Sequence, residues 1–246
     1  MRQLLPFAAD VDPAEAYGAD RRERPDRRPW VLANMVTSVD GAAAVAGRTG
    51  QLGGAADKAV FSAIRGVADV IVAAAGTVRA ERYHPPRPPS DTVARGRAER
   101  GQAPRPRLVV VTRQMDLDPD LPLFAEPDQR PLVVTCAAAD PDRRARIEPV
   151  ADVIELGQES VDLAAMVTWL GEHGARVVLT EGGPTLLGQL VAEGLVDELC
   201  LTIAPLLVAG PERRIAHSVE HPAVTDLVLD RVLEAEGELL LRYRRA

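Results

Sequence analysis

The stretch RVVLTEGGPTL, residues 176–186, decides how this chain is organised. Its first half, 176–180, is a short apolar run typical of a buried strand, and Pro184 stands where the first residue of a helix is expected. The two glycines between them let the backbone approach a ligand closely, and a helix that begins there offers unpaired N–H groups to a phosphate or pyrophosphate. Glu181 follows the strand directly. A buried carboxylate at that place is costly unless it is paired or functional.

Similar apolar runs, separated by helical patterns, occupy most of the chain. Buried strands are expected at residues 30–36, 67–75, 108–112, 132–136, 150–156, 196–204, 225–233 and 237–243, and helices at 57–66, 161–171 and 184–193. Runs of Val, Leu and Ile that alternate with helices require crossover connections, which produce a largely parallel sheet with helices on both faces. The sequence therefore predicts one three-layer α/β domain over residues 30–246.

Two charged segments fall outside this pattern. Residues 1–29 end in the run RRERPDRRP, residues 21–29, and we expect them to form a solvated N-terminal arm. Residues 82–107 contain prolines at 85, 86, 88, 89, 104 and 106, which exclude a helix or a central strand there. That segment is expected to be a long surface loop, either a plain connector or a loop that closes over a ligand.

The composition argues against several classes of protein. Of 246 residues, 29 are basic and 36 acidic, and the net charge of −7 argues against a nucleic-acid or anionic-membrane partner. The longest apolar run, residues 70–75, is far shorter than the ~20 residues that span a bilayer, and the apolar stretch near the start is too short for a secretory signal. We therefore expect a cytoplasmic protein.

Cysteines and histidines offer no recognisable metal site. Cys136 and Cys200 lie in apolar, strand-like stretches, where buried and inert thiols are expected, and two cysteines cannot form a disulfide framework. The four histidines form no H-x-E, no H-E-x-x-H and no close cluster with cysteine. This pattern argues against a zinc hydrolase or zinc deaminase, and no metal is expected.

Polar residues gather where strands pass into helices, and ligands of open α/β sheets bind beyond the carboxyl ends of the strands. The junctions are TSVDG at 37–41, Gly76-Thr77, Thr112-Arg113 and EGGPT at 181–185, and a glycine-rich loop, GRTGQLGG at 47–54, precedes a helix. No G-x-G-x-x-G occurs, so a Rossmann dinucleotide fold is not supported. The small polar residues suit a cleft for a nicotinamide and a flat heterocycle.

These motifs resemble the reductase domain of the bifunctional riboflavin-biosynthesis deaminase-reductases, which adopt the dihydrofolate-reductase-like fold. Residues 37–41 are similar to the S-L-D-G signature of that family, and AGTVRAE at 75–81 is similar to its G-T-V-x-A-D segment. The third motif is EGGPTL at 181–186, followed by GLVDEL at 194–199 and Ala204-Pro205. The resemblance extends from about residue 30 to the C-terminus.

The resemblance implies a homodimer that reduces a pyrimidine or pterin-like substrate with NADPH as the cofactor. The resemblance implies that Thr49, Arg65 and Glu181 face the substrate, and Asn34, at the position of a lysine common in the family, is a further substrate-binding candidate. The residues that it implies for the cofactor, together with their neighbours at the same junctions, are Ser38, Gln51, Gly76, Thr77, Glu81, Thr112, Arg113, Gly182, Gly183, Pro184, Thr185 and Leu186. Gln51 takes the place of a tryptophan that is usual in the family.

Hydride transfer also requires an acid that protonates the nitrogen beside the reduced carbon. Glu181 is the first candidate for orienting or protonating the substrate. Asp40 is the second, unless its carboxylate instead holds the loop together. Arg65 is expected to bind a phosphate or carboxylate of the substrate, and Arg113 beside a threonine hydroxyl suits the 2′-phosphate of NADPH. The apolar segment 195–207 is the expected dimer interface.

Two departures from the family leave the substrate open. The deaminase motifs H-x-E and P-C-x-x-C are absent, so a stand-alone reductase is expected. Asn34 stands where the family commonly has a lysine, which removes a cation that could meet a substrate phosphate. Three functions stay open: a riboflavin-pathway reductase of the 5-amino-6-(5-phosphoribosylamino)uracil type, a dihydrofolate reductase-like enzyme that acts on a pterin, and a nucleotide-binding protein without turnover.

Overall fold

The computed structural model describes residues 1–23, 26, 28–217 and 224–246. Within them, eleven strands form one sheet: β1 (Arg2–Leu5), β2 (Ala9–Asp10), β3 (Trp30–Ser38), β4 (Val70–Ala74), β5 (Arg107–Val111), β6 (Leu132–Thr135), β7 (Asp152–Glu155), β8 (Val177–Thr180), β9 (Glu198–Ala204), β10 (Leu227–Ala235) and β11 (Glu238–Arg245). The helices are α1 (Pro13–Gly18), α2 (Ala55–Val67), α3 (Ala75–Ala80), α4 (Asp91–Glu99), α5 (Pro141–Ile147), α6 (Leu163–Glu172) and α7 (Pro184–Ala192), with 3₁₀ turns at Pro122–Phe124 and Pro127–Gln129. The predicted strands and helices are all present. The short helices α3 and α5 were not predicted.

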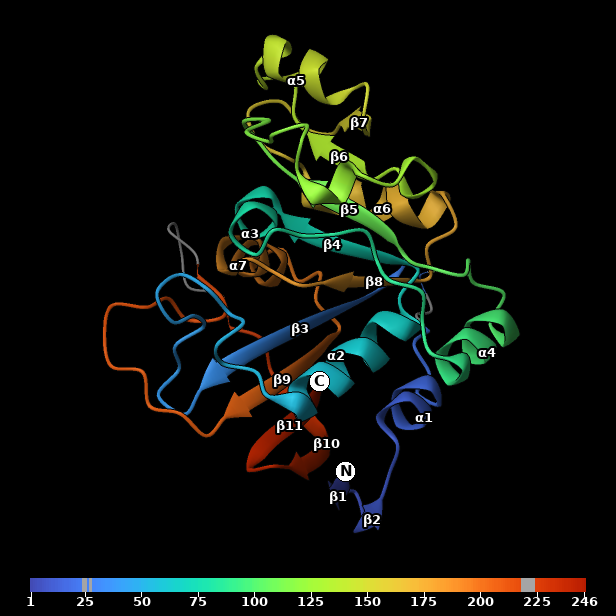
Figure 1. The fold of residues 1–246 in the computed structure, drawn as a ribbon, viewed down its shortest axis with the longest axis vertical. Coiled ribbons are helices and arrows are strands. Elements are labelled where there is room, and N and C mark those ends of the chain that lie inside the picture. The colour runs from blue at the N-terminus through green and yellow to red at the C-terminus, as the bar shows by residue number, and fades with distance from the viewer. Residues whose placement is uncertain (24–25, 27, 218–223) are drawn as a thin grey trace.

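Figure 1 shows a twisted sheet whose strands lie in the order β2-β1-β10-β11-β9-β3-β8-β4-β5-β6-β7. From β9 to β7 neighbouring strands are parallel, as their crossover connections require. From β9 to β2 they are antiparallel. The hairpin of β10 and β11 closes at Glu236 and Gly237, whose φ angles of +56° and +80° suit a two-residue turn. The predicted, largely parallel sheet is confirmed, and it carries an antiparallel extension.

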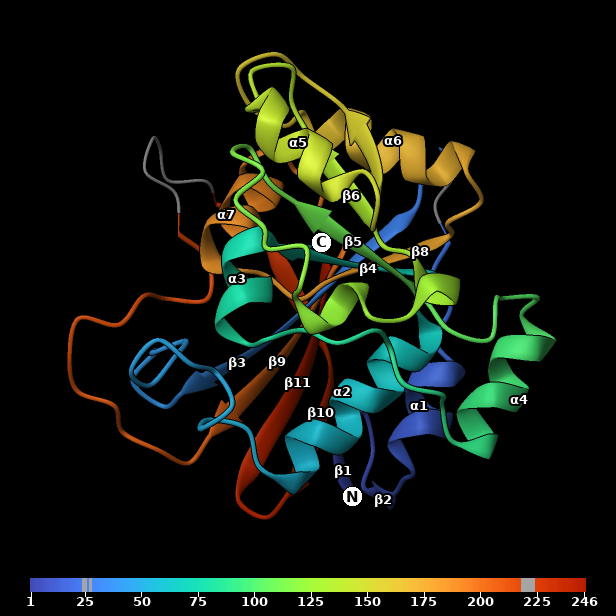
Figure 2. The ribbon, with the colours of Figure 1, turned by 45° about the horizontal axis from the view of Figure 1, so that its top comes forward.

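Helices cover both faces of the parallel part of the sheet (Figure 2). On one face α2 buries Val60 and Ile64, one turn apart, in a core cluster that includes Leu32 of β3. On the other face α6 and α7 bury residues such as Met166 against the sheet, around Val178 of β8. The three-layer architecture predicted from the sequence is therefore present.

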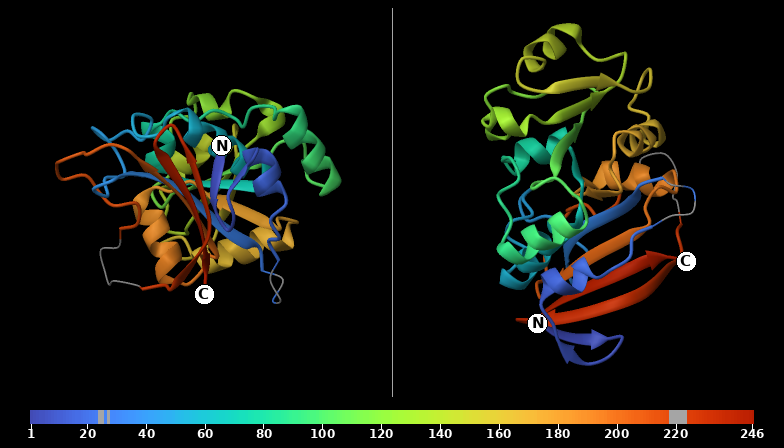
Figure 3. Two further views of the ribbon diagram at one scale, coloured as in Figure 1. Left: turned by 90° about the horizontal axis from the view of Figure 1, so that it is seen from below. Right: turned by 90° about the vertical axis from the view of Figure 1, so that its right-hand side faces the viewer.

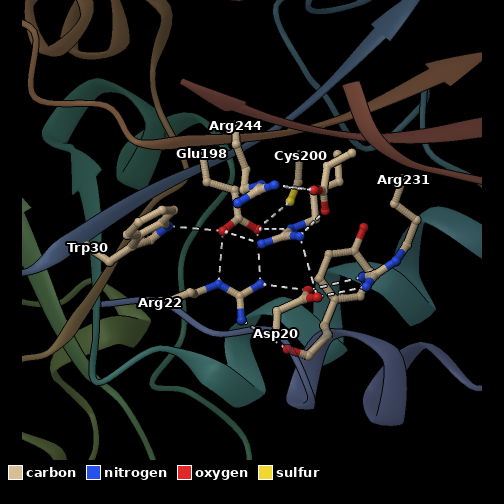
Figure 4. Close-up of polar contacts among 10 residues, drawn as sticks. Asp20, Arg22, Trp30, Glu198, Cys200, Arg231 and Arg244 are labelled. Atoms are coloured by element: carbon tan, nitrogen blue, oxygen red, sulfur yellow. Dashed lines mark hydrogen bonds and ion pairs between the residues drawn. The ribbon is translucent and has the colours of Figure 1, made fainter. Parts of the chain in front are cut away.

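Residues 1–23 do not form the solvated arm that their charge suggested. β1 pairs with β10, and Tyr17 of α1 is fully buried in the same core as α2. Figure 3 shows these N-terminal elements along the antiparallel end of the sheet. Their charge is accommodated because Arg22 and Arg242 both bind the buried carboxylate of Glu198, which also accepts a hydrogen bond from the indole of Trp30 (Figure 4). Residues 24, 25 and 27 of the charged run lie outside the described residues.

The segment 82–107 is not the continuous surface loop expected from its prolines, because α4 lies within it. All of those prolines flank residues 90–103, so the stretch between them is free to form a helix. Arg97 of α4 is only 1% exposed, and its guanidinium donates to the backbone carbonyls of Gly66 and Ala68 at the end of α2. These bonds anchor α4 to the helix that it covers.

Both cysteines are buried and unpaired, as predicted. Among the residues that the structure describes, no group of three or more His, Cys, Asp or Glu side chains could hold a metal ion, and His221 lies outside those residues. In the same part of the chain, no helix has both the length and the apolar character needed to cross a bilayer.

Candidate active site

Two of the four predicted junctions, those after β4 and β8, meet at one edge of the sheet, because these strands are parallel neighbours. The turn after β8 lies against the start of α3. The Ala74 N–H donates to the Gly182 carbonyl at 2.8 Å, and a Cβ atom at Gly183 would stand 2.7 Å from Thr77 Oγ1. Gly182 itself has a φ of +84°, which glycine adopts without strain. A side chain is therefore disfavoured at Gly182 by the backbone conformation and at Gly183 by the close approach of Thr77.

A cavity of about 250 Å³ opens at this edge, between β3, α2, the glycine-rich loop and the turn after β8. It brings together predicted site residues from five separate stretches of sequence: Asn34, Thr49, Arg65, Thr77, Glu81 and Glu181. The junctions after β4 and β8 contribute Thr77 and Glu181 to this cavity, whereas the junctions at 37–41 and 112–113 do not line it.

Glu181 is fully engaged by two neighbours. The Arg65 guanidinium donates from Nε and Nη2 to the two carboxylate oxygens, each at 2.7 Å, and the Tyr83 hydroxyl donates to Oε2 at 2.6 Å. Burial alone would lower the pKa of Arg65, but the charge of Glu181 outweighs it and raises that pKa. Burial, and then the carboxylate of Glu181, raise the pKa of Tyr83 well above its usual value. A carboxylate paired in this bidentate way is suited to orient its neighbours rather than to give up a proton.

Glu81 fastens the glycine-rich loop over the cavity. Its Oε1 accepts hydrogen bonds from the Thr49 backbone N–H at 2.7 Å and from the Thr49 hydroxyl at 3.0 Å. These bonds join the loop at 47–54 to the residue that follows α3. Thr49 and Glu81 were assigned to substrate and cofactor respectively, and the structure places them in direct contact.

Asp40 lies outside the cavity, on an exposed turn. Ser38 Oγ donates to its carboxylate at 2.5 Å, and the Val208 backbone N–H donates to the same oxygen at 3.0 Å. The hydrogen bond from Ser38, followed by that from Val208, lowers the pKa of Asp40. Ser38 is itself buried and accepts from the Ala42 N–H. Of the two roles considered for Asp40, these contacts favour the structural one, a link between the turn at 37–41 and the segment after β9.

Asn34 of β3 lines the cavity and carries no charge, unlike the lysine that is common at this position in the family. A different cation is present on α2. Lys58, in the first turns of α2, lines the same cavity. Asp57, Phe61 and Tyr83 line it too. None of these three residues was predicted to belong to the site, and neither was Lys58. Helical spacing could have found two of them, because residues 57, 61 and 65 fall on one face of a helix and Arg65 was already assigned to the site.

The remaining predicted cofactor residues lie outside this cavity. Ser38 ends β3, Gly76 begins α3, and Thr112 and Arg113 follow β5, whereas Gln51 belongs to the glycine-rich loop and Pro184, Thr185 and Leu186 begin α7. Arg113 and Thr185 are exposed, so their side chains are open to a ligand. Leu186 is buried in the core beneath α7 and offers a ligand only its backbone.

A second cavity, of about 440 Å³, lies between α2 and the proline-rich residues that precede α4. Phe61, Arg65, Glu81 and Tyr83 line both cavities and so form the wall between them. Arg87 and Arg97 also line the larger cavity. Residues 82–107 were expected either to be a plain connector or to close over a ligand. In the structure, part of this segment lines a cavity beside the site.

Comparison with known proteins gives consistent results. The family model of the RibD C-terminal domain matches residues 29–239. A 2,5-diamino-6-ribosylamino-4(3H)-pyrimidinone 5′-phosphate reductase of Methanothermobacter thermautotrophicus is 31% identical over 188 residues, covering 76% of this chain and 82% of that protein. A reductase of the same name from Archaeoglobus fulgidus is 29% identical over 186 residues, covering 74% of this chain and 83% of that protein.

Among solved structures, a pyrimidine reductase-like protein of Corynebacterium diphtheriae superposes with a TM-score of 0.85 at 27% identity, over 96% of this chain and 99% of that one. This likeness confirms an α/β fold shared with a pyrimidine reductase-like protein. The family match spans the three motifs and the residues of the 250 Å³ cavity. The chain therefore belongs to the RibD C-terminal domain family.

Proposed function

We propose that this protein is an NADPH-dependent reductase of the riboflavin pathway, which transfers a hydride to the C=N bond of a ribosylaminopyrimidine 5′-phosphate in the cytoplasm. The observation that carries the proposal is the 250 Å³ cavity, in which Arg65, Glu181 and Thr77 meet beside the Gly182-Gly183 turn. Relatives named for the reduction of such a pyrimidine phosphate match this chain over more than four-fifths of their length, which supports the same assignment.

The residues around the turn fit a nicotinamide dinucleotide phosphate. α7 begins at Pro184, and its N-cap, Gly183, makes no side-chain hydrogen bond to the first turn. The N–H groups of that turn are therefore available to a pyrophosphate. The missing Cβ of Gly183 leaves room beside Thr77, and the exposed Arg113 suits the 2′-phosphate. NADPH supplies a hydride when it is bound there.

The substrate phosphate needs cations at fixed positions, and the cavity offers two. Glu181, itself bound by the Tyr83 hydroxyl, holds Arg65 at the wall shared by both cavities, and Lys58 adds a second positive charge from α2. A guanidinium held in this way loses little further freedom when it binds an anion. Lys58 supplies the cation that is missing at Asn34, and this supports a phosphorylated substrate over an uncharged ring.

The proposed assembly is a homodimer, and burial supports only the end of the segment 195–207 as part of its interface. Leu195 and Val196 of the segment 195–207 are buried, whereas Leu207 at its end is 81% exposed. The open face of the antiparallel extension supplies further exposed apolar side chains, among them Leu229 and Leu239. Apolar area of this kind normally belongs to an interface. A sedimentation experiment at micromolar concentration that finds only a 26.4 kDa species would contradict the dimer.

The function is tested by following NADPH absorbance with three candidate substrates in parallel. These are the diaminopyrimidinone and aminouracil forms of the ribosylamine phosphate, and dihydrofolate. We expect rapid NADPH oxidation with at least one pyrimidine and none with dihydrofolate. Turnover of dihydrofolate alone would identify a pterin reductase, and tight NADPH binding without turnover of any of the three would identify a binding protein.

A further inference from the structure

Three carboxylates line the 250 Å³ cavity, those of Asp57, Glu81 and Glu181, and each makes different polar contacts. Both oxygens of Glu181 are bound to Arg65, and Glu81 is fastened to the glycine-rich loop. Asp57 differs from both. Within the part of the chain that the structure describes, no arginine or lysine forms an ion pair with Asp57. Asp57 therefore differs from Glu181, which is ion-paired with Arg65, and from Glu81, whose carboxylate accepts two hydrogen bonds from Thr49.

The Asp57 side chain lines the cavity and does not cap its own helix. It lies in the first turn of α2, where an aspartate often caps its own helix. Here the buried Glu238 of β11 performs that task, accepting the Gly54 N–H at 2.6 Å and the Asp57 N–H at 2.9 Å. The Asp57 carboxylate instead lies over Gly53, where an added Cβ would stand 2.1 Å from Oδ2. Gly53 lines the cavity as well, so the carboxyl occupies the space that a side chain there would fill.

The groups around Asp57 favour its protonated form. Burial raises the pKa of its carboxyl, and the nearby charge of Glu238 raises it further. A hydrogen bond with Thr202 of β9 and the positive charge of Lys58 on the same helix act in the opposite direction, but the pKa remains above that of an ordinary aspartate. Asp40 shows the contrasting case, since its hydrogen bonds lower its pKa.

We propose that Asp57, rather than Glu181 or Asp40, is the catalytic acid of this site. The inference rests on the proposed function. With NADPH bound, a hydride would add to the carbon of the substrate C=N bond. The π electron pair of that bond would move to the nitrogen, which takes the proton of the Asp57 carboxyl, so that one C–H and one N–H bond replace the π bond. Asp57 is left as a carboxylate beside Lys58 and Thr202. It regains a proton from solvent before the next turnover.

The test compares Asp57→Asn and Asp57→Glu with the wild-type protein, using the pyrimidine that supports turnover. Asparagine keeps the shape and a hydrogen bond but has no proton to give, so kcat should fall by about 10²-fold or more. Glutamate should restore part of that loss. In the wild type, kcat should fall as the pH rises through the pKa of Asp57, and this limb should vanish in Asp57→Asn. NADPH affinity, measured by fluorescence titration, should not change.

The matched control is Asp142→Asn, which removes an exposed aspartate from the first turn of α5, outside both cavities. Its turnover and pH profile should equal those of the wild type. A second variant avoids any folding defect of Asp57→Asn. Thr202→Val removes the hydroxyl that lowers the pKa of Asp57, so the limb of the pH profile should move to higher pH.

Each outcome bears on the proposal. Turnover of Asp57→Asn within about threefold of wild type would overturn it, as would a limb that stays in place in Thr202→Val. If the wild type does not oxidise NADPH with either pyrimidine, the proposed function is refuted, and the inference about Asp57, which depends on it, is refuted as well. An active wild type beside an unaffected Asp57→Asn refutes the inference alone, so the two failures are distinguishable.

Discussion

Replacing Glu181 by glutamine should cost both stability and turnover, and the structure assigns the two losses different causes. The Glu181 side chain is 3% exposed and that of Arg65 is 26% exposed. Glutamine preserves the shape of Glu181 but leaves the guanidinium with a neutral partner. The stability loss then comes from the uncompensated charge of Arg65. The loss of turnover comes from an Arg65 that is no longer fixed at the wall of the cavity.

The size of the stability loss can be bounded. Removing one member of a buried ion pair typically costs about 3–5 kcal/mol. Arg65 retains some contact with solvent, and the glutamine oxygen still accepts one of its hydrogen bonds, so we expect about 2 kcal/mol, below that range. For a chain of this length, such a loss lowers Tm by about 4–8 °C. Turnover should fall by about 10²-fold, the scale that follows from misplacing a group that positions the substrate.

A double-mutant cycle separates the pair from its surroundings. Urea unfolding would be measured for Glu181→Gln, Arg65→Met and the double variant, with Glu126→Gln of the exposed Arg105–Glu126 pair as the control. The control should lose no more than about 1 kcal/mol. The double variant should be more stable than the sum of the single losses implies, by about 1–2 kcal/mol. Strict additivity, or full turnover in Glu181→Gln, would refute the reasoning.

Three further predictions concern the cofactor and the sheet. Arg113→Ala should lose about 1.5–3 kcal/mol of binding to NADPH and almost none to NADH, which comparative fluorescence titration measures; equal losses would show that Arg113 does not contact the 2′-phosphate. Gly183→Ala should weaken NADPH binding in the same titration, because its Cβ would stand 2.7 Å from Thr77 Oγ1, and unchanged affinity would place the cofactor elsewhere. Burial would raise the pKa of Glu198, but Arg22 and other arginine contacts lower it to about 2 from the usual 4.5, so its stabilising contribution should be complete above pH 4.5 and lost as the pH falls toward 2. Denaturant unfolding across that interval measures the loss, which Glu198→Gln should abolish.

The sequence by itself determined the architecture of the parallel part of the sheet. Short, almost uniformly apolar runs such as 30–36 and 67–75 are typical of strands that are buried on both faces of a sheet. The helices between them act as crossover connections, which make neighbouring strands parallel. The turn at 181–185 was equally visible, because two glycines and a proline have local conformational preferences that do not depend on the rest of the chain. The meeting of the junctions after β4 and β8 followed, since neighbouring parallel strands end at one edge.

The segments that the sequence misassigned are those whose state depends on distant partners. The charged N-terminal residues resembled a solvated arm, but Arg22 is neutralised by Glu198, more than 170 positions away. The helix α4 was obscured by prolines that only flank it, and its Arg97 is satisfied by carbonyl groups at the end of α2. A buried charge is tolerated only when the fold supplies its partner, and the sequence does not show that partner.

The candidate site divides in the same way. Motifs at strand ends predicted that Thr77 and Glu181 would lie near one another, and the family resemblance added Arg65 to the site. Only the tertiary structure decided that Glu181 is paired with Arg65 and that no arginine or lysine among the described residues forms an ion pair with Asp57. The physical reason is that an acid–base role depends on burial and on the charges of neighbouring side chains, and those neighbours come from α2, β9 and β11, which are far apart in the sequence and adjacent only in the fold.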